Sequence, residues 1–218
     1  GAFFTQSVFL ITDRKNHIYN RRNVVKWRKR KSAENGETAD LEKEETNMYF
    51  GVQMYGVSKE WKQDPEGFLK KIYEAGYRQI EPCLGFRVDA RDYGFWIPED
   101  LEQAMPLLAK YHIEVHAVHI FLDKYHYERE LAILTELAQK YHISWFVVKS
   151  PARLTKDVLD ETAARYCELA EELEKAGAGL LVHNEKEDIC IRVNGKTAYE
   201  YLLEACGEKV GAEVDVGW

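Results

Sequence analysis

The sequence predicts an α/β fold, a (β/α)₈ TIM barrel of which about six βα units are present. Three observations carry this prediction. Short apolar strand signals recur at intervals of about thirty residues, which is the length of a βα unit. Amphipathic helix signals lie between them, and strict alternation of strand and helix predicts a parallel sheet covered by helices. Polar side chains close each strand, as expected where strands deliver an active site at their carboxyl ends.

Six segments have the apolar or β-branched composition of strands. They are YFGVQMY (49–55), YRQIEPCL (77–84), IEVHAVHIFL (113–122), ISWFVVKS (143–150), GLLVHNE (179–185) and KVGAEVDV (209–216). Helix signals cover 64–76, 98–112, 126–142, 156–177 and 196–206. In the first of these, Asp64 is the expected N-cap, Pro65 takes the first helical position and Gly76 ends the segment.

The residues after the first strand separate the two common parallel architectures. A dinucleotide-binding fold would show G-x-G-x-x-G there, and YGVSKEW has no such pattern. The sequence therefore favours the barrel.

Polar residues stand at equivalent points of successive units. They are Gln53 and Tyr55, Glu81, His119, Lys149, the run His183, Asn184 and Glu185, and Asp215. Each alone is more often a satisfied structural or surface residue. Their recurrence at strand ends instead indicates one common pocket.

His183, Glu185 and Asp215 are the candidate metal ligands. In an extended strand His183 and Glu185 share a face, and Asp215 closes the next strand. Histidine with carboxylates and no nearby cysteine suits Mn²⁺, Mg²⁺, Co²⁺ or Zn²⁺. The alternative is a solvated loop after a hydrogen-bonded core histidine.

The motifs GVQMYGV, DPEGFLKKIYEAGYRQIE, HAVHIFL, LVHNEKED and EVDVGW resemble the sugar phosphate isomerase/epimerase family, the xylose-isomerase-like barrels. The resemblance covers essentially all of 48–218. Relatives typically end the fifth strand in His-Asn-His, and Glu185 replaces the second histidine, so His183 and Glu185 both stay candidates for the ligand there. The family's metal set takes one ligand from each of the last four strands, of which this chain supplies the fifth-strand group and Asp215.

The resemblance implies a divalent-metal-dependent isomerase, epimerase or dehydratase that moves a proton next to the carbonyl of a sugar or cyclitol, through an enediolate. We expect Glu185 to take part in proton transfer, with Lys149 as an electrostatic or proton-transfer group. Tyr55, Glu81 and His119 are expected to orient substrate hydroxyls. A non-catalytic sugar-binding barrel or an inactive fragment is the main alternative. An abasic-site endonuclease, found in the same superfamily, is the weaker one.

Charge separates the first 47 residues from the rest of the chain. Of 30 Lys and Arg and 37 Asp and Glu residues, 10 and 7 lie in 1–47, so 48–218 has a formal net charge of −10. The basic block 21–31 could serve as a nucleic-acid arm, but the acidic remainder argues against a nucleic-acid partner. We expect 1–47 to be a disordered extension or a mis-assigned start before Met48, and 48–218 to be a partial barrel domain.

Chain length and hydropathy complete the expectations. The sequence reaches Trp218 directly after the sixth strand, whereas a full barrel takes about 250 residues, so about two βα units are expected to be missing. No apolar run has the length of a bilayer span, and no secretory signal or disulfide pattern is evident. We expect a cytoplasmic protein without a membrane partner. These features are also compatible with a homo-oligomer.

Overall fold

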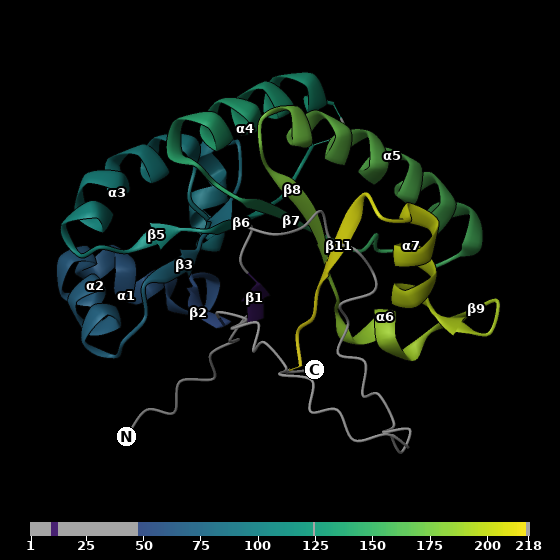
Figure 1. Ribbon diagram of the computed structural model, residues 1–218, viewed down its shortest axis with the longest axis horizontal. Coiled ribbons are helices and arrows are strands. Elements are labelled where there is room, and N and C mark those ends of the chain that lie inside the picture. Colours follow the sequence, from purple (N-terminus) through teal and green to yellow (C-terminus); the bar gives the residue numbers. More distant parts are fainter. Residues whose placement is uncertain (1–9, 13–47, 124, 217–218) are drawn as a thin grey trace, which may run out of the picture.

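An open arc of parallel strands, wrapped on its outer side by helices, forms the described part of the chain (Figure 1). The computed structural model describes residues 10–12, 48–123 and 125–216. Within 1–47 it therefore describes only the short strand β1 (Leu10–Thr12), which pairs antiparallel with β2 (Met48–Gln53). The prediction of a disordered or mis-assigned extension otherwise lies outside the described residues.

The strands follow one another around the arc in chain order. After β2 come β3 (Gln79–Glu81) with β4 (Cys83–Leu84), β5 (Glu114–Val115) with β6 (Ala117–Ile120), β7 (Trp145–Lys149), β8 (Gly179–His183) and β11 (Val210–Glu213). Each strand, or pair of short strands, in this order pairs in parallel with the next. Pro82 has no N–H for the ladder, so it separates β3 from β4, while its carbonyl accepts from the His119 N–H at 2.9 Å. The predicted α/β fold with an incomplete barrel is confirmed.

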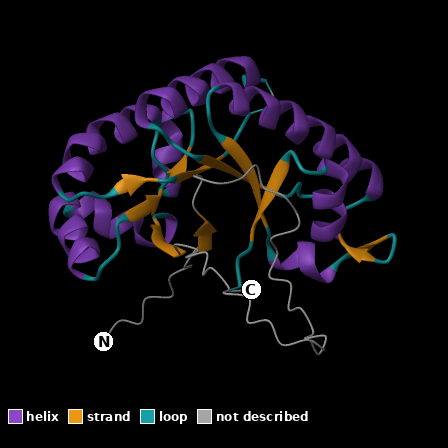
Figure 2. Cartoon of the chain, viewed as in Figure 1, coloured by secondary structure: helices purple, strands orange, loops and turns teal. Residues whose placement is uncertain are grey.

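Helices alternate with these strands as the sequence predicted (Figure 2). They are α1 (Ser58–Gln63), α2 (Pro65–Glu74), α3 (Pro98–Lys110), α4 (Tyr127–Tyr141), α5 (Lys156–Lys175), α6 (Lys186–Cys190) and α7 (Ala198–Cys206), with 3₁₀ turns η3 (Tyr55–Val57) and η4 (Val88–Tyr93) and a hairpin of β9 (Arg192–Val193) and β10 (Lys196–Thr197). The Asp64 carboxylate accepts from the Gly67 N–H at 2.9 Å, which confirms the predicted N-cap of α2. Within the described ranges, no helix combines the length and apolar character needed to cross a bilayer.

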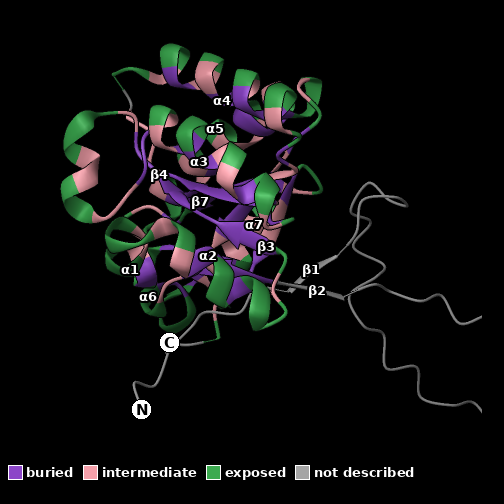
Figure 3. Ribbon diagram, turned by 90° about the vertical axis from the view of Figure 1, so that its left-hand side faces the viewer, coloured by how far each residue is buried: buried purple, intermediate pink, exposed green. Residues whose placement is uncertain are grey.

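The two faces of the strands have different neighbours because successive side chains alternate. Val118, Phe146 and Leu180 are buried in the main core. Ala117 and Val147 on the opposite face form a small inner cluster with the neighbouring strand's Leu181. Figure 3 shows buried strands inside and exposed outer surfaces on the helices. The core between strands and helices thus supports a separate inner face.

Glycine on the inner face makes room for bulky neighbours. A Cβ on Gly179 would lie 2.3 Å from the Trp145 ring, and one on Gly211 would lie 2.7 Å from a methyl group of Leu181. Trp145 pairs with Gly179 across the β7–β8 ladder, so the indole can lie over the bare backbone of its neighbour. Tryptophan and glycine together determine how the inner face is filled.

We predict that Gly179→Ala lowers the free energy of unfolding by about 1–3 kcal/mol, because the new methyl group collides with a ring that has to shift. Chemical denaturation measures this change. Adding Trp145→Leu should remove part of the penalty, so the double variant should be more stable than the sum of the two single changes implies. Gly56→Ala is the matched control because a Cβ there meets no atom within 4 Å. Strict additivity would contradict the packing argument.

Candidate active site

Parallel register brings the ends of neighbouring strands to one level. Lys149 is paired with His183, and His183 with Glu213. His119 is paired with Val147, two residues before Lys149 on the same strand. Since partners in a parallel ladder point to the same side, these polar side chains share the inner face at the carboxyl ends of the strands.

Three of these side chains form the centre of the candidate site. His119, His183 and Glu213 each offer one potential ligand atom, and these atoms lie within 4.8 Å of one another. His183 Nδ1 lies 2.8 Å from Glu213 Oε1, and the two imidazole rings meet edge to face with centroids 5.2 Å apart. Two further carboxylates flank them: Glu81 Oε1 lies 3.6 Å from His119 Nδ1, and Asp215 Oδ2 lies 3.8 Å from His183 Nε2.

Several polar atoms of this cluster are buried without a hydrogen-bond partner. Both carboxylate oxygens of Glu81, Oε2 of Glu213 and Nδ1 of His119 are in this condition, and the three side chains are only 3–7% exposed. Buried polar atoms are normally satisfied, because desolvating one without compensation costs several kcal/mol. Oxygen and nitrogen donors that converge in this way match the donor set of a divalent cation.

Burial makes ionisation of the Glu81 and Glu213 carboxyls unfavourable. Burial raises the pKa of Glu81 to about 7, although the neighbouring Glu213 carboxyl and the charge of His183 act in the opposite direction. Burial and the charge of Glu81 likewise raise the pKa of Glu213 to about 7, although His183 opposes this. Without a cation, the pair therefore tends to keep a proton near neutral pH.

The pKa values of the two histidines, His119 and His183, are shifted in opposite directions. Burial lowers the pKa of His119 to about 4, so this imidazole is neutral at physiological pH and has a lone pair for a metal or a hydrogen bond. Burial also lowers the pKa of His183, but the hydrogen bond to Glu213 and the charges of Glu213, Asp215 and Glu81 outweigh it, so that the net shift is upward. The carboxylates thus act mainly on His183.

Glu185 and Lys149 form a separate pair at the rim. Lys149 Nζ lies 3.5 Å from Glu185 Oε1, and both side chains are about half exposed. Strand β8 ends at His183, and Glu185 is already the N-cap of α6, where its N–H donates to Asp188 Oδ2 at 2.8 Å. The structure therefore places Glu185 against Lys149, next to the His119, His183 and Glu213 cluster.

Asn184 fixes the backbone that carries Asp215. Its fully buried amide donates from Nδ2 to the Asp215 carbonyl at 3.0 Å and accepts from the Asp215 N–H at 2.8 Å. These two bonds extend the β8–β11 pairing beyond the end of the ladder. Asn184, which points away from His183 in the chain, therefore positions a neighbouring carboxylate.

Tyr55 lies further out than the other predicted site residues. It belongs to η3, its side chain is 55% exposed, and its ring centroid lies 5.7 Å from that of Phe95. The structure therefore places Tyr55 on an exposed turn after β2, outside the buried cluster of His119, His183 and Glu213.

Glu213 is the central residue that the sequence analysis missed. The segment EVDV places Glu213 and Asp215 two positions apart, so in an extended chain both side chains point to the same face. The period of two residues was the signal that could have identified Glu213.

Comparison with solved structures shows the same fold in two enzymes. A sugar phosphate isomerase/epimerase from Parabacteroides distasonis is 22% identical with a TM-score of 0.62, and the match covers 77% of this chain and 65% of that protein. The probable 3-DHS dehydratase AsbF of petrobactin synthesis from Bacillus anthracis is 13% identical with a TM-score of 0.53, over 77% and 62% of the two chains. The chain thus spans less than two thirds of either protein. No protein-family model and no curated protein matches the sequence.

We predict that the metal-free protein loses stability as pH rises from about 4.5 to about 7, the interval between the unfolded and folded pKa of Glu81 and Glu213. A carboxyl whose pKa is raised on folding binds its proton more tightly in the folded state. The stability that the protonated pair contributes is therefore fully present below the unfolded pKa and is lost as the pH rises to the folded pKa, on the order of 3 kcal/mol for the pair.

Denaturant unfolding in a chelator across this interval is the measurement. Glu81→Gln should flatten the pH profile, since the amide cannot ionise, while Glu187→Gln, at an exposed position, serves as the control. A wild-type profile that coincides with that of Glu81→Gln would contradict the burial argument.

Proposed function

We propose that the chain carries the site of a divalent-metal-dependent isomerase, epimerase or dehydratase that moves a proton next to the carbonyl of a sugar or cyclitol. The observation that carries the proposal is the buried cluster of His119, His183 and Glu213, whose potential ligand atoms lie within 4.8 Å. It lies at the carboxyl ends of parallel strands, where barrel enzymes assemble their active sites. The enzymatic relatives in fold support this choice of chemistry.

A divalent ion fits these residues. The buried oxygens of Glu81 and Glu213 that have no hydrogen-bond partner would gain a cationic neighbour, and the neutral His119 offers a nitrogen. We assign the binding to His119, His183 and Glu213, with Asp215 adjacent. Mn²⁺, Mg²⁺, Co²⁺ and Zn²⁺ are all compatible with nitrogen and oxygen donors. When bound, such an ion supplies Lewis-acid stabilisation of negative charge on substrate oxygens.

Proton transfer is the proposed task of the Lys149 and Glu185 pair. Glu185 is held by the α6 N-terminus and stays about 42% exposed, so its carboxylate can reach a substrate carbon above the buried cluster. Lys149 Nζ lies 3.5 Å from that carboxylate and can donate a hydrogen bond to a substrate oxygen. Glu81 and His119 then orient substrate hydroxyls from below, in addition to any contact with the ion.

We predict that His183→Ala, Glu213→Gln and Asp215→Asn each weaken Mn²⁺ binding by at least about tenfold, because each removes a donor or a charge from the cluster. Isothermal titration calorimetry measures the affinity, and circular dichroism checks the fold. Glu187→Gln removes an exposed carboxylate close to Glu185 in sequence and is the matched control. Equal affinities of wild type and all three variants would argue for a non-catalytic sugar-binding barrel or an inactive fragment.

We further predict that Glu185→Gln leaves Mn²⁺ affinity within about twofold of wild type and abolishes exchange of the substrate C–H, because the amide cannot accept the proton. NMR detects this exchange as deuterium incorporation in D₂O, across a panel of ketohexoses, ketopentoses and inososes. Lys149→Met should slow the exchange without loss of metal. If Glu185→Gln loses as much metal affinity as His183→Ala, Glu185 is a ligand and the assigned division of roles is wrong.

A further inference from the structure

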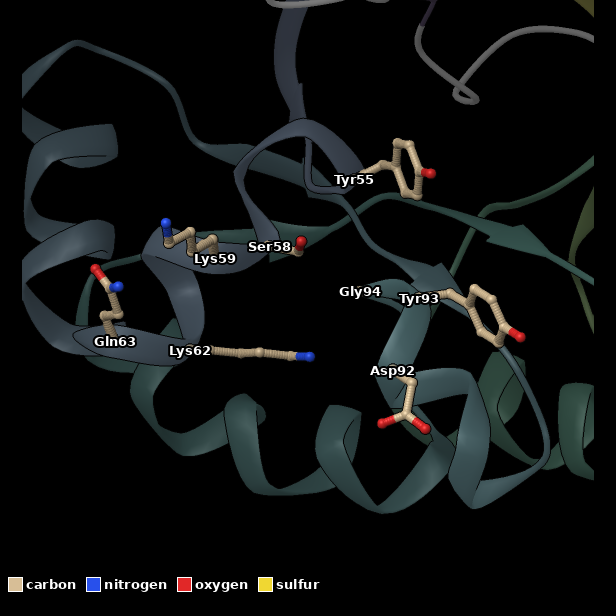
Figure 4. A pocket seen from close by; sticks show the side chains of 8 residues that line it. All are labelled: Tyr55, Ser58, Lys59, Lys62, Gln63, Asp92, Tyr93 and Gly94. Carbon is tan, nitrogen blue, oxygen red and sulfur yellow. The ribbon is translucent and has the colours of Figure 1, made fainter.

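We propose that a pocket between α1 and η4, joined to the cluster by a series of ring contacts, binds a second, uncharged hydroxyl-rich ring, so that the ligand is a disaccharide or another glycoside. This inference rests on the proposed function for the identity of the first ring. The pocket holds about 470 Å³ and is lined by residues of η3, α1 and η4 (Figure 4). Both of its walls follow the carboxyl ends of strands β2 and β4, the face on which the cluster lies.

Specific contacts hold the two walls of the pocket together. Gly94, at φ +85°, ends η4 directly against α1, where a Cβ would lie 2.6 Å from Ser58 Oγ. Lys62 Nζ donates to the Arg91 carbonyl at 2.5 Å across the gap. The Arg91 guanidinium in turn binds both oxygens of Asp100 on α3, at 2.6 and 2.8 Å. The pocket is therefore a built feature of two anchored loops.

A continuous series of rings leads from the cluster to the pocket. The His119 imidazole stacks on Phe121 with centroids 5.2 Å apart, and Phe121 stacks on Phe95 at 4.4 Å and 8°. The centroid of the Phe95 ring then lies 5.7 Å from that of Tyr55 and 6.4 Å from that of Tyr93. This series of ring contacts connects the cluster with the pocket.

The two tyrosines are unusually exposed for residues in such a series. Tyr55 is 55% exposed and Tyr93 is 70% exposed, and Figure 4 shows both rings on the same side of the pocket. Rings of this kind present an apolar face and a polar hydroxyl. They suit the aliphatic face of a sugar ring, which packs on aromatic carbon while its hydroxyls meet polar groups at the edge.

The remaining polar groups favour neutral hydroxyls over an anion. Figure 4 shows the Lys62 side chain extending towards Asp92 across the pocket, with Ser58 on the α1 wall and the Lys59 ammonium directed away. An ammonium, a carboxylate and a hydroxyl together offer donors and acceptors, which hydroxyl groups need. A phosphate would meet the Asp92 carboxylate, and the Lys62 ammonium already donates to a backbone carbonyl.

Calorimetry on the whole chain in a chelator tests the proposal independently of metal chemistry. The ligand pairs are glucose with cellobiose, galactose with lactose, and xylose with xylobiose. We expect the disaccharide of at least one pair to bind about fivefold or more tightly than its monosaccharide, as one added ring contact predicts. Tyr93→Ala and Asp92→Asn should reduce this ratio towards one. Tyr73→Ala, which removes another exposed tyrosine outside the pocket, should leave it unchanged.

Three results would overturn the proposal. The first is equal affinity within every pair, and the second is a ratio that Tyr73→Ala lowers as much as Tyr93→Ala. The third is binding of glucose 6-phosphate that exceeds that of every disaccharide and disappears in Lys62→Met, which would make the pocket an anion site. Because the metal is removed throughout, failure of the metal-dependent reaction leaves these results unaffected. Conversely, equal affinities would leave the metal and exchange experiments intact.

Discussion

The mutual burial of Glu81 and Glu213 is the constraint on which the rest of the site depends. Two carboxyls taken out of water beside each other cannot both ionise at low cost, and the pKa of each is raised to about 7. The strand register places both side chains on the inner face, at the carboxyl ends of β3 and β11. A positive charge next to these two carboxyls would therefore stabilise their ionised forms, and His183 provides part of that charge when it is protonated.

Local patterns in the sequence were sufficient for the architecture and for much of the cluster. Strand and helix signals alternate, and in parallel sheets successive strands become neighbours, so polar residues at their ends had to converge. The structure brings Glu81, His119, His183 and Asp215 together in this way. Their convergence follows from the order of the strands in the sheet, which the alternation of strand and helix signals in the sequence predicts.

The positions of the other site residues depend on where each strand ends. We assumed that β8 continues to Glu185, which would place its side chain beside that of His183. The strand ends at His183 and the chain turns into α6, so Glu185 meets Lys149 instead. The break at Pro82 and the ring contacts of Phe95 are likewise set by loop geometry, for which periodicity provides no information.

The pair of hydrogen bonds between Asn184 and the backbone of Asp215 also has a dynamic consequence. The Asp215 amide proton is bound to an oxygen of a side chain that solvent cannot reach. It can exchange with solvent deuterium only when the segment after β11 separates from β8. The exchange rate of this single proton thus reports how often the site opens, on a timescale of minutes to hours.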